Sequence, residues 1–236
     1  GLASFEGACF HTARWDHGVP LDGRRIGVIG NGSTGVQIIS ALATRAGRLH
    51  HFQRTAQWIM PVENPEFTEE QRAAFRADPA LLHYMQNQPD YLANVERFNN
   101  SLVNADSQGI AEIEATCLAN LENSVRDPVL RERLRPHYRA ACKRLIYSPD
   151  YYEAIQHPNA ELVSDGIECL EPRGVRLKNG RLVELDVLAL ARPALAADRA
   201  DVSRKVILTW HKLILELVRH TATYVPPVAA RAFAYI

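Results

Sequence analysis

Apolar and polar residues follow two different periodicities near the start of the chain. The apolar run at 25–29 is typical of a short buried strand, and a glycine-rich turn follows it at 30–35. Apolar residues then recur at helical spacing over 36–43, before a second short apolar run at 49–52. This succession of strand, turn, helix and strand predicts a βαβ unit within an α/β fold.

From residue 66 the pattern becomes helical over a long stretch. Thr68 and Gln71 have the spacing of a capping box, in which each side chain bonds a free backbone N–H at the start of a helix. Prolines then interrupt the helical pattern, because proline removes a backbone donor and disfavours helix at the preceding residue. These prolines are Pro79, Pro89 and Pro128. We therefore predict several helices inserted into the α/β domain over 66–140.

The large apolar residues of this inserted region allow two interpretations, a core or a surface for a partner. They are Tyr84, Met85, Tyr91 and Phe98. We favour the core, because most residues of this kind are buried in folded proteins.

Short apolar runs return after the insertion. They occupy 161–163, 167–170, 175–177, 181–185 and 187–190. Asn179 and Gly180 lie between two of these runs and tolerate the positive φ of a hairpin turn. We therefore predict a small β-ribbon that leads into a return strand at 187–190.

The charges of the chain balance, and this limits its partners. The 27 lysines and arginines equal the 27 aspartates and glutamates, so no excess charge favours binding to nucleic acid. No apolar run reaches the ~18 residues that a membrane span needs. The four cysteines form no CxxC pair and have no histidine at zinc-ligand spacing. We expect no metal site and no disulfide scaffold, and a reducing, cytoplasmic setting.

The glycine-rich turn carries the candidate cofactor site. Gly30 permits the tight turn, Gly32 lets the backbone approach a pyrophosphate, and Gly35 lets the helix pack closely on the strand. The helix directs free N–H groups and the positive end of its dipole at the anion. The position between a strand and a helix favours this interpretation over an ordinary glycine loop. The candidate cofactor-binding residues of this segment are Gly30, Asn31, Gly32, Ser33, Thr34, Gly35 and Gln37.

The end of the second strand indicates which dinucleotide binds. A site for NAD places an acidic residue about 20 residues after the turn, where it binds the ribose 2′-hydroxyl. This chain has Gln53, Arg54 and Thr55 there instead. A guanidinium matches a 2′-phosphate, which a carboxylate would repel, so we predict NADP(H) with Arg54 and Thr55 as cofactor-binding residues. The alternative is a solvated surface arginine, since most arginines are exposed.

These patterns divide the chain into four regions. Residues 1–65 hold an N-terminal linker motif and the first part of a Rossmann-like NADP-binding domain, and 66–140 form the helical insertion. Residues 141–191 complete the domain and include the β-ribbon. Residues 192–236 form a divergent tail, in which we expect a helix over 202–219.

The linker motif connects the chain to a known family. The spacing F-x-G-x-x-x-H-x-x-x-W-D runs from Phe5 to Asp16. With the glycine turn and the segment 52–55 following in the same order, it resembles type I Baeyer–Villiger monooxygenases, flavoproteins close to the flavin-containing monooxygenases. The resemblance covers about residues 1–190. It implies that His11 lies between two nucleotide-binding domains and serves catalysis through domain coupling more than through proton transfer.

A further match follows the insertion. Cys142, Lys143 and Arg144, and then Tyr151 and Tyr152, resemble a Lys-Arg pair and paired tyrosines of the family. By this resemblance Lys143 helps to hold the 2′-phosphate, and Arg144 is a catalytic residue that faces the flavin. A guanidinium suits that place because it stays charged and stabilises an anion without giving up its proton. Without the resemblance, a solvated basic pair at a helix end is the better interpretation.

The resemblance implies an enzyme that uses FAD and NADPH. Such an enzyme takes a small-molecule ketone and O₂ as reaction partners and inserts one oxygen atom next to the carbonyl, giving an ester or lactone. The glycine motif that binds FAD in the family lies before the linker motif and is missing from these 236 residues. We therefore expect that the FAD-binding domain is missing from this chain and that the chain alone is inactive.

Two other functions stay open at this point. One is a flavin-dependent N- or S-oxygenating monooxygenase, and the other is a non-catalytic NADPH-binding remnant. The return strand also continues into Arg192 and Pro193, where the family has a turn containing Ala-Thr-Gly. A truncated or frame-shifted gene product would explain the departures at both ends.

Overall fold

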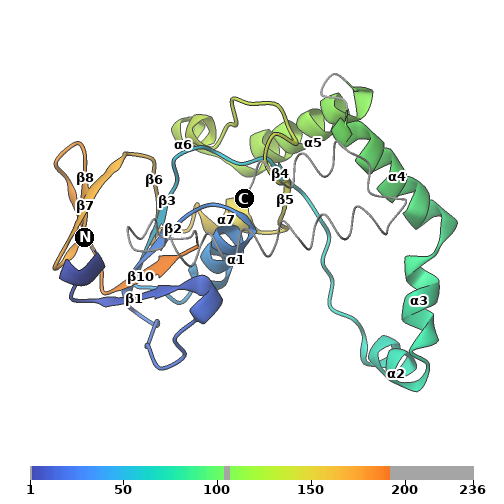
Figure 1. Ribbon diagram of the computed structural model, residues 1–236, viewed down its shortest axis with the longest axis horizontal. Coiled ribbons are helices and arrows are strands. Elements are labelled where there is room, and N and C mark those ends of the chain that lie inside the picture. Colours follow the sequence, from blue (N-terminus) through green and yellow to red (C-terminus); the bar gives the residue numbers. More distant parts are fainter. Residues whose placement is uncertain (1, 104–106, 192–236) are drawn as a thin grey trace, which may run out of the picture. The chain divides into compact units, whose positions relative to one another are not determined.

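The computed structural model describes residues 2–103 and 107–191 (Figure 1). The tail at 192–236 and the helix expected over 202–219 lie outside the described residues. Eight side chains of the helices at 80–86 and 89–103, among them that of Tyr91, also lie outside the description.

A parallel sheet of five strands confirms the predicted α/β class (Figure 1). Its strands lie in the order β1, β10, β2, β3, β6, and each is parallel to its neighbours. The predicted strands at the glycine turn and the return strand are confirmed, while the sequence pattern does not predict β1. The bounds are β1 (Ala8–His11), β2 (Arg25–Ile29), β3 (Arg48–Phe52), β6 (Ala160–Val163) and β10 (Val187–Leu190).

Both faces of this sheet are covered. On one face, Ile26 and Val28 of β2 share a core with the helices α1 (Ser33–Leu42) and α7 (Tyr151–Ala154). On the other face, Phe52 of β3 shares a second core with the β-ribbon. Because successive side chains of a strand point to opposite faces, strands in such a sheet are apolar throughout, as the short apolar runs predict.

The β-ribbon is a separate antiparallel sheet of β7 (Ile167–Glu171), β8 (Gly174–Leu177) and β9 (Leu182–Glu184). Gly180 has a φ of 88° in the turn between β8 and β9, which confirms the predicted hairpin. The strand β6 pairs with β3 in the parallel sheet instead of joining the ribbon. Leu162 and Val163 of β6 lie in different cores, as both faces of this strand are covered.

Within the described residues of the inserted segment, five helices confirm the helical prediction. The capping box is present, since Thr68 Oγ1 accepts the N–H of Gln71 and Gln71 Oε1 accepts the N–H of Thr68. Each predicted proline break falls between two helices or at a helix start. The helices are α2 (Glu69–Ala77), α3 (Ala80–Gln86), α4 (Pro89–Val103), α5 (Gln108–Ser124) and α6 (Pro128–Arg133).

The helix α5 attaches the inserted segment to the rest of the chain. It packs against a two-stranded parallel sheet of β4 (Ile59–Met60) and β5 (Ile146–Tyr147), and its Leu121 enters the core beneath the parallel sheet. The core interpretation is wrong for Tyr84 and Met85, which are 67% and 49% exposed. Both residues lie on α3, and the main packing partner of α3 among the described elements is α2. The usual preference of large apolar side chains for burial is therefore not met on α3.

Candidate functional site

The carboxyl ends of the parallel strands meet at one edge of the sheet. The last residues of four neighbouring strands are aligned, because His11 pairs with Leu190, Leu190 with Ile29, and Ile29 with Phe52. The chain runs from β2 toward β3 and β6 and returns as β10 on the other side of β2, so the strand order reverses at β2. Ligands of open α/β sheets bind at such a reversal, beyond the carboxyl ends of the strands.

The glycine turn lies at this reversal, and two of its glycines have structural roles. Gly30 has a φ of 110°, and its N–H bonds the carbonyl of Phe52 at 3.1 Å. A Cβ at Gly35 would lie 1.9 Å from the carbonyl oxygen of Gly30. The close packing of helix on strand therefore requires glycine at 35, and the left-handed φ favours glycine at 30.

Gly32 differs from these two glycines because it borders open space. A Cβ there would meet no atom within 4 Å. Gly32 is also the N-cap of α1, and no side chain caps this helix start. The first N–H groups of α1 therefore remain available to an anion, with Ser33 half-buried and Thr34 and Gln37 exposed beside them.

A buried histidine supports the turn from below. His51 Nε2 lies 3.1 Å from the carbonyl oxygen of Gly30, and His51 Nδ1 lies 3.0 Å from the hydroxyl of Tyr151. Since the carbonyl can only accept, Nε2 carries the proton and Nδ1 accepts from the tyrosine. Burial lowers the pKa of His51 to about 4 and raises the pKa of Tyr151, so both are neutral.

Asn31 ties the turn to the segment that follows β3. Its Nδ2 donates to the carbonyl of Thr55 at 2.6 Å and to Gln53 Oε1 at 3.2 Å. Gln53 is buried and donates to the carbonyl of Arg133, at the end of α6. The predicted residues Asn31 and Thr55 are thus in direct contact.

Arg54 lies between these anchored residues, and its side chain is exposed. No described residue forms a hydrogen bond or an ion pair with its guanidinium. Arg54 is therefore an unpaired cation beside the glycine turn. Residues 53–55 include no carboxylate that would repel a phosphate.

Lys143 is connected to the turn through two intermediate residues, Tyr138 and Gln57. Its Nζ lies 4.4 Å from the centre of the Tyr138 ring, and the Tyr138 hydroxyl donates to Gln57 Oε1 at 2.8 Å. Gln57 Nε2 in turn donates to Asn31 Oδ1 at 3.5 Å.

The two predicted catalytic residues are not brought together by a described contact. His11 ends β1, at the ligand edge of the sheet, and its Nδ1 accepts the N–H of Ala13 at 3.0 Å. Arg144 is exposed beyond Lys143. Sequence reasoning missed His51, which bonds the carbonyl of Gly30, and it missed Gln57 and Tyr138, which connect Asn31 to Lys143. No local sequence motif indicates the role of His51 or the contacts of Tyr138.

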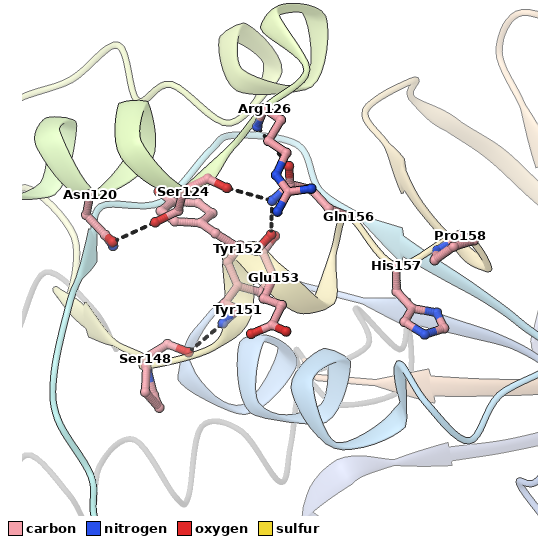
Figure 2. Close-up of a pocket in the computed structure, with 11 residues that line it drawn as sticks. Asn120, Ser124, Arg126, Ser148, Tyr151, Tyr152, Glu153, Gln156, His157 and Pro158 are labelled. Atoms are coloured by element: carbon pink, nitrogen blue, oxygen red, sulfur yellow. Dashed lines mark hydrogen bonds between the residues drawn. The ribbon is translucent and has the colours of Figure 1, made fainter.

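A cavity of about 570 Å³ lies at a different place, on the helix side of the sheet (Figure 2). None of the predicted site residues lines it. Its polar groups bond one another, since Gln156 donates to the carbonyls of Ser124 and Tyr152 and accepts the N–H of Arg126. It is lined by Asn120, Ser124, Arg126, Ser148, Pro149, Tyr151, Tyr152, Glu153, Gln156, His157 and Pro158.

Across 2–103 and 107–191, no helix is both long and apolar enough to cross a membrane. The same residues contain no group of three or more histidine, cysteine, aspartate or glutamate side chains that is arranged to hold a metal ion.

The chain is similar to known monooxygenases. No family model matches it. It is 46% identical over 193 residues to a Mycobacterium tuberculosis protein named "Uncharacterized monooxygenase", a match that covers 81% of this chain and 38% of that protein. It is 33% identical over 188 residues to a Streptomyces coelicolor protein named "Baeyer-Villiger monooxygenase", covering 80% of this chain and 36% of that protein.

A solved structure agrees with these relatives. The crystal structure of cyclohexanone monooxygenase from Rhodococcus sp. Phi1 bound to NADP+ matches with a TM-score of 0.66 and 30% identity, over 81% of this chain and 42% of that one. The chain therefore spans about two fifths of the length of the proteins it matches.

Proposed function

We propose that this chain, which belongs to the Baeyer–Villiger monooxygenase family over about 80% of its length, binds NADP(H). It would be the NADP(H)-binding portion of a FAD-dependent monooxygenase. The complete enzyme would insert one oxygen atom from O₂ next to the carbonyl of a ketone, giving an ester or lactone. We also propose that residues 1–65 and 141–191 form the NADP-binding domain and that 66–140 are a helical insertion in it.

The residues at the glycine turn fit NADP(H). Gly32 leaves open space for the pyrophosphate, and the uncapped start of α1 offers N–H donors and a positive dipole end to it. Asn31 holds the turn against Thr55, and Gly35 keeps α1 close to β2. When bound, NADPH supplies a hydride for reduction of the flavin.

The observation that carries the proposal is the unpaired guanidinium of Arg54 next to this turn. A buried or salt-bridged arginine would have no free donors, whereas Arg54 keeps its planar fork for a phosphate. Lys143 is connected to Asn31 of the turn through Tyr138 and Gln57, and we propose it as a second cation for the phosphate. The exposed guanidinium of Arg54, with Lys143 as a second cation, favours the 2′-phosphate of NADP(H) over the 2′-hydroxyl of NAD(H).

Two residues of this chain are proposed to act toward the flavin or its domain. Arg144 is the one residue proposed to face the flavin, and His11 the one proposed to couple the nucleotide-binding domains. Both are exposed or half-buried, and no described contact connects them. We propose that a FAD-binding domain of the complete enzyme holds the flavin.

The proposal is tested by nucleotide affinities of the purified chain. Dissociation constants for NADP+ and NAD+ are compared between the wild type, Arg54→Ala and the control Arg76→Ala, which removes an exposed arginine of α2. We expect Arg54→Ala to weaken NADP+ about tenfold and to leave NAD+ unchanged, since one charge-assisted phosphate contact is lost. An unchanged NADP+ preference in Arg54→Ala contradicts the assignment.

A further inference from the structure

Tyr138 lies where three segments of the chain meet. Its carbonyl accepts the indole N–H of Trp58 at 2.8 Å, and its hydroxyl donates to Gln57 at 2.8 Å. Its ring lies beneath the ammonium of Lys143, 4.4 Å from Nζ. Backbone, hydroxyl and ring of one residue are thus each fixed by a different partner.

The hydroxyl connects this residue to the nucleotide-binding turn. Gln57 accepts from Tyr138 and donates to Asn31 Oδ1 at 3.5 Å, while Asn31 donates to the carbonyl of Thr55 at 2.6 Å. A continuous series of contacts therefore runs from Asn31 in the turn to the ammonium of Lys143.

The backbone that carries Lys143 is fixed as well. Glu114 on α5 accepts the N–H of Ala140 at 2.8 Å and a guanidinium N–H of Arg139 at 2.9 Å. Ala140 is buried, and Ala141 has a φ of 68°, the one positive φ of a non-glycine residue within the described ranges. An alanine holds this conformation only where the surroundings impose it, so the direction of the chain before Lys143 is set by the insertion.

We propose that Tyr138 is a positioning residue that holds the Lys143 ammonium where the 2′-phosphate of NADP(H) binds. A free lysine is a point charge on a flexible stem of four carbons, and binding a phosphate must restrict it. An aromatic face beneath the ammonium restricts the side chain before the nucleotide arrives. The inference rests on the proposed function, and it makes the helical insertion a determinant of nucleotide selectivity.

The test compares NADP+ and NAD+ affinities of the full chain in three variants. Tyr138→Leu removes the ring and the hydroxyl, Tyr138→Phe removes the hydroxyl alone, and Lys143→Ala removes the charge. All leave the Tyr138 carbonyl available to Trp58. We expect Tyr138→Leu to weaken NADP+ about fivefold and Tyr138→Phe about twofold, with NAD+ unchanged in both.

The combination Tyr138→Leu with Lys143→Ala supplies the decisive readout. If the ring acts through the ammonium, the double variant binds NADP+ no more weakly than Lys143→Ala alone. The control Tyr84→Leu, at an exposed tyrosine of α3, is expected to change neither affinity.

Three results would overturn the inference. Equal losses for NADP+ and NAD+ in Tyr138→Leu would reduce Tyr138 to a structural residue. An unchanged NADP+ affinity in that variant, together with a loss in Lys143→Ala, would reject the positioning role and leave the proposed function intact. An unchanged preference in both Lys143→Ala and Arg54→Ala would reject the proposed function and the inference together.

If Tyr138→Leu does not fold, a second pair of variants tests the inference. Tyr138→Phe and Gln57→Leu remove the two partners of one hydrogen bond. We expect a twofold loss of NADP+ affinity in Tyr138→Phe, at least that loss in Gln57→Leu, which also removes the bond to Asn31, and no further loss when Tyr138→Phe is added to Gln57→Leu. A further loss in the double variant, or an equal loss of NAD+ affinity in Tyr138→Phe, contradicts the inference.

Discussion

The glycine turn at 30–35 and the loop at 138–144 are both proposed to contact NADP(H), but they are fixed in different ways. The turn is held by backbone geometry, through the φ of Gly30 and the close approach of Gly35. The loop is held by side chains of Gln57, Trp58 and Glu114, which are distant from it in the sequence. The first kind of site can be recognised from a local motif, and the second depends on tertiary contacts.

The largest effect on stability is expected inside the turn, where Gly35 is closely packed and Gly32 borders open space. Gly35→Ala places a Cβ 1.9 Å from the carbonyl oxygen of Gly30, so we expect a loss of at least about 3 kcal/mol in the free energy of unfolding. Gly32→Ser meets no atom within 4 Å and puts a favourable residue at an N-cap, so stability should change by less than about 0.5 kcal/mol.

Nucleotide binding separates these two variants further. Gly32→Ser should bind NADP+ more weakly than the wild type while staying folded, because its side chain enters the space proposed for the pyrophosphate. Denaturant unfolding and NADP+ titration of both variants check the pair. A folded Gly32→Ser variant with wild-type affinity would show that this space is not used by the nucleotide.

The support beneath the turn predicts a pH dependence of stability. His51 has a folded-state pKa of about 4 because it is buried, and its ordinary value is 6.5. The unfolded chain therefore binds more protons between these two values, and stability is lost as the pH falls through this window. We expect His51 to account for a loss of about 2 kcal/mol between pH 7 and pH 5.

The contribution of His51 is isolated by comparison with His51→Gln, which can still donate to Gly30. Burial also lowers the pKa of His50, and this group remains in both proteins. The difference between the two unfolding free energies, measured at pH 7 and at pH 5, should therefore shrink by about 2 kcal/mol at the lower pH. An equal pH dependence in the two proteins would contradict a neutral, buried His51.

A smaller effect is expected in the loop. Glu114→Gln keeps an oxygen for the N–H of Ala140 and loses the ion pair with Arg139. We expect a loss of about 1 kcal/mol in the free energy of unfolding, since a charge-assisted bond becomes a neutral one. Thermal unfolding followed by circular dichroism measures it, with Glu112→Gln, an exposed residue of the same helix, as the control.

The smallest effect is expected on α3. Tyr84 is 67% exposed, so Tyr84→Ser should change the free energy of unfolding by less than about 0.5 kcal/mol. A loss of several times that amount would restore the core interpretation that the structure contradicts.

Much of the fold could be predicted from local patterns. The strands at 25–29 and 187–190 are apolar because both faces of the sheet are covered, and the start of α2 follows from the capping box at Thr68. The strand β1 could not be predicted, because its four residues carry no periodicity and pair with β10 from far along the chain. The exposure of Tyr84 depends on which helices pack together, which the sequence pattern does not contain.

The candidate site divides in the same way. The glycine positions could be predicted from the motif, and Arg54 from its place about 20 residues after the turn. The roles of His51 and Tyr138 follow from contacts across 21 and 81 residues, to Gly30 and Gln57, and no spacing rule indicates them. Polar residues that support a site are thus harder to find than those that border it.

The central claim is that this chain recognises the 2′-phosphate of NADP(H). The most direct measurement is calorimetric titration of the wild-type chain with NADP+ and NAD+ in parallel, at about 0.05 M and about 0.5 M salt. We predict that NADP+ binds at least about tenfold more tightly at low salt and that the difference narrows at high salt, because ion pairs with an exposed arginine are screened. Equal affinities at both salt concentrations, or no saturable binding of NADP+, would contradict the claim.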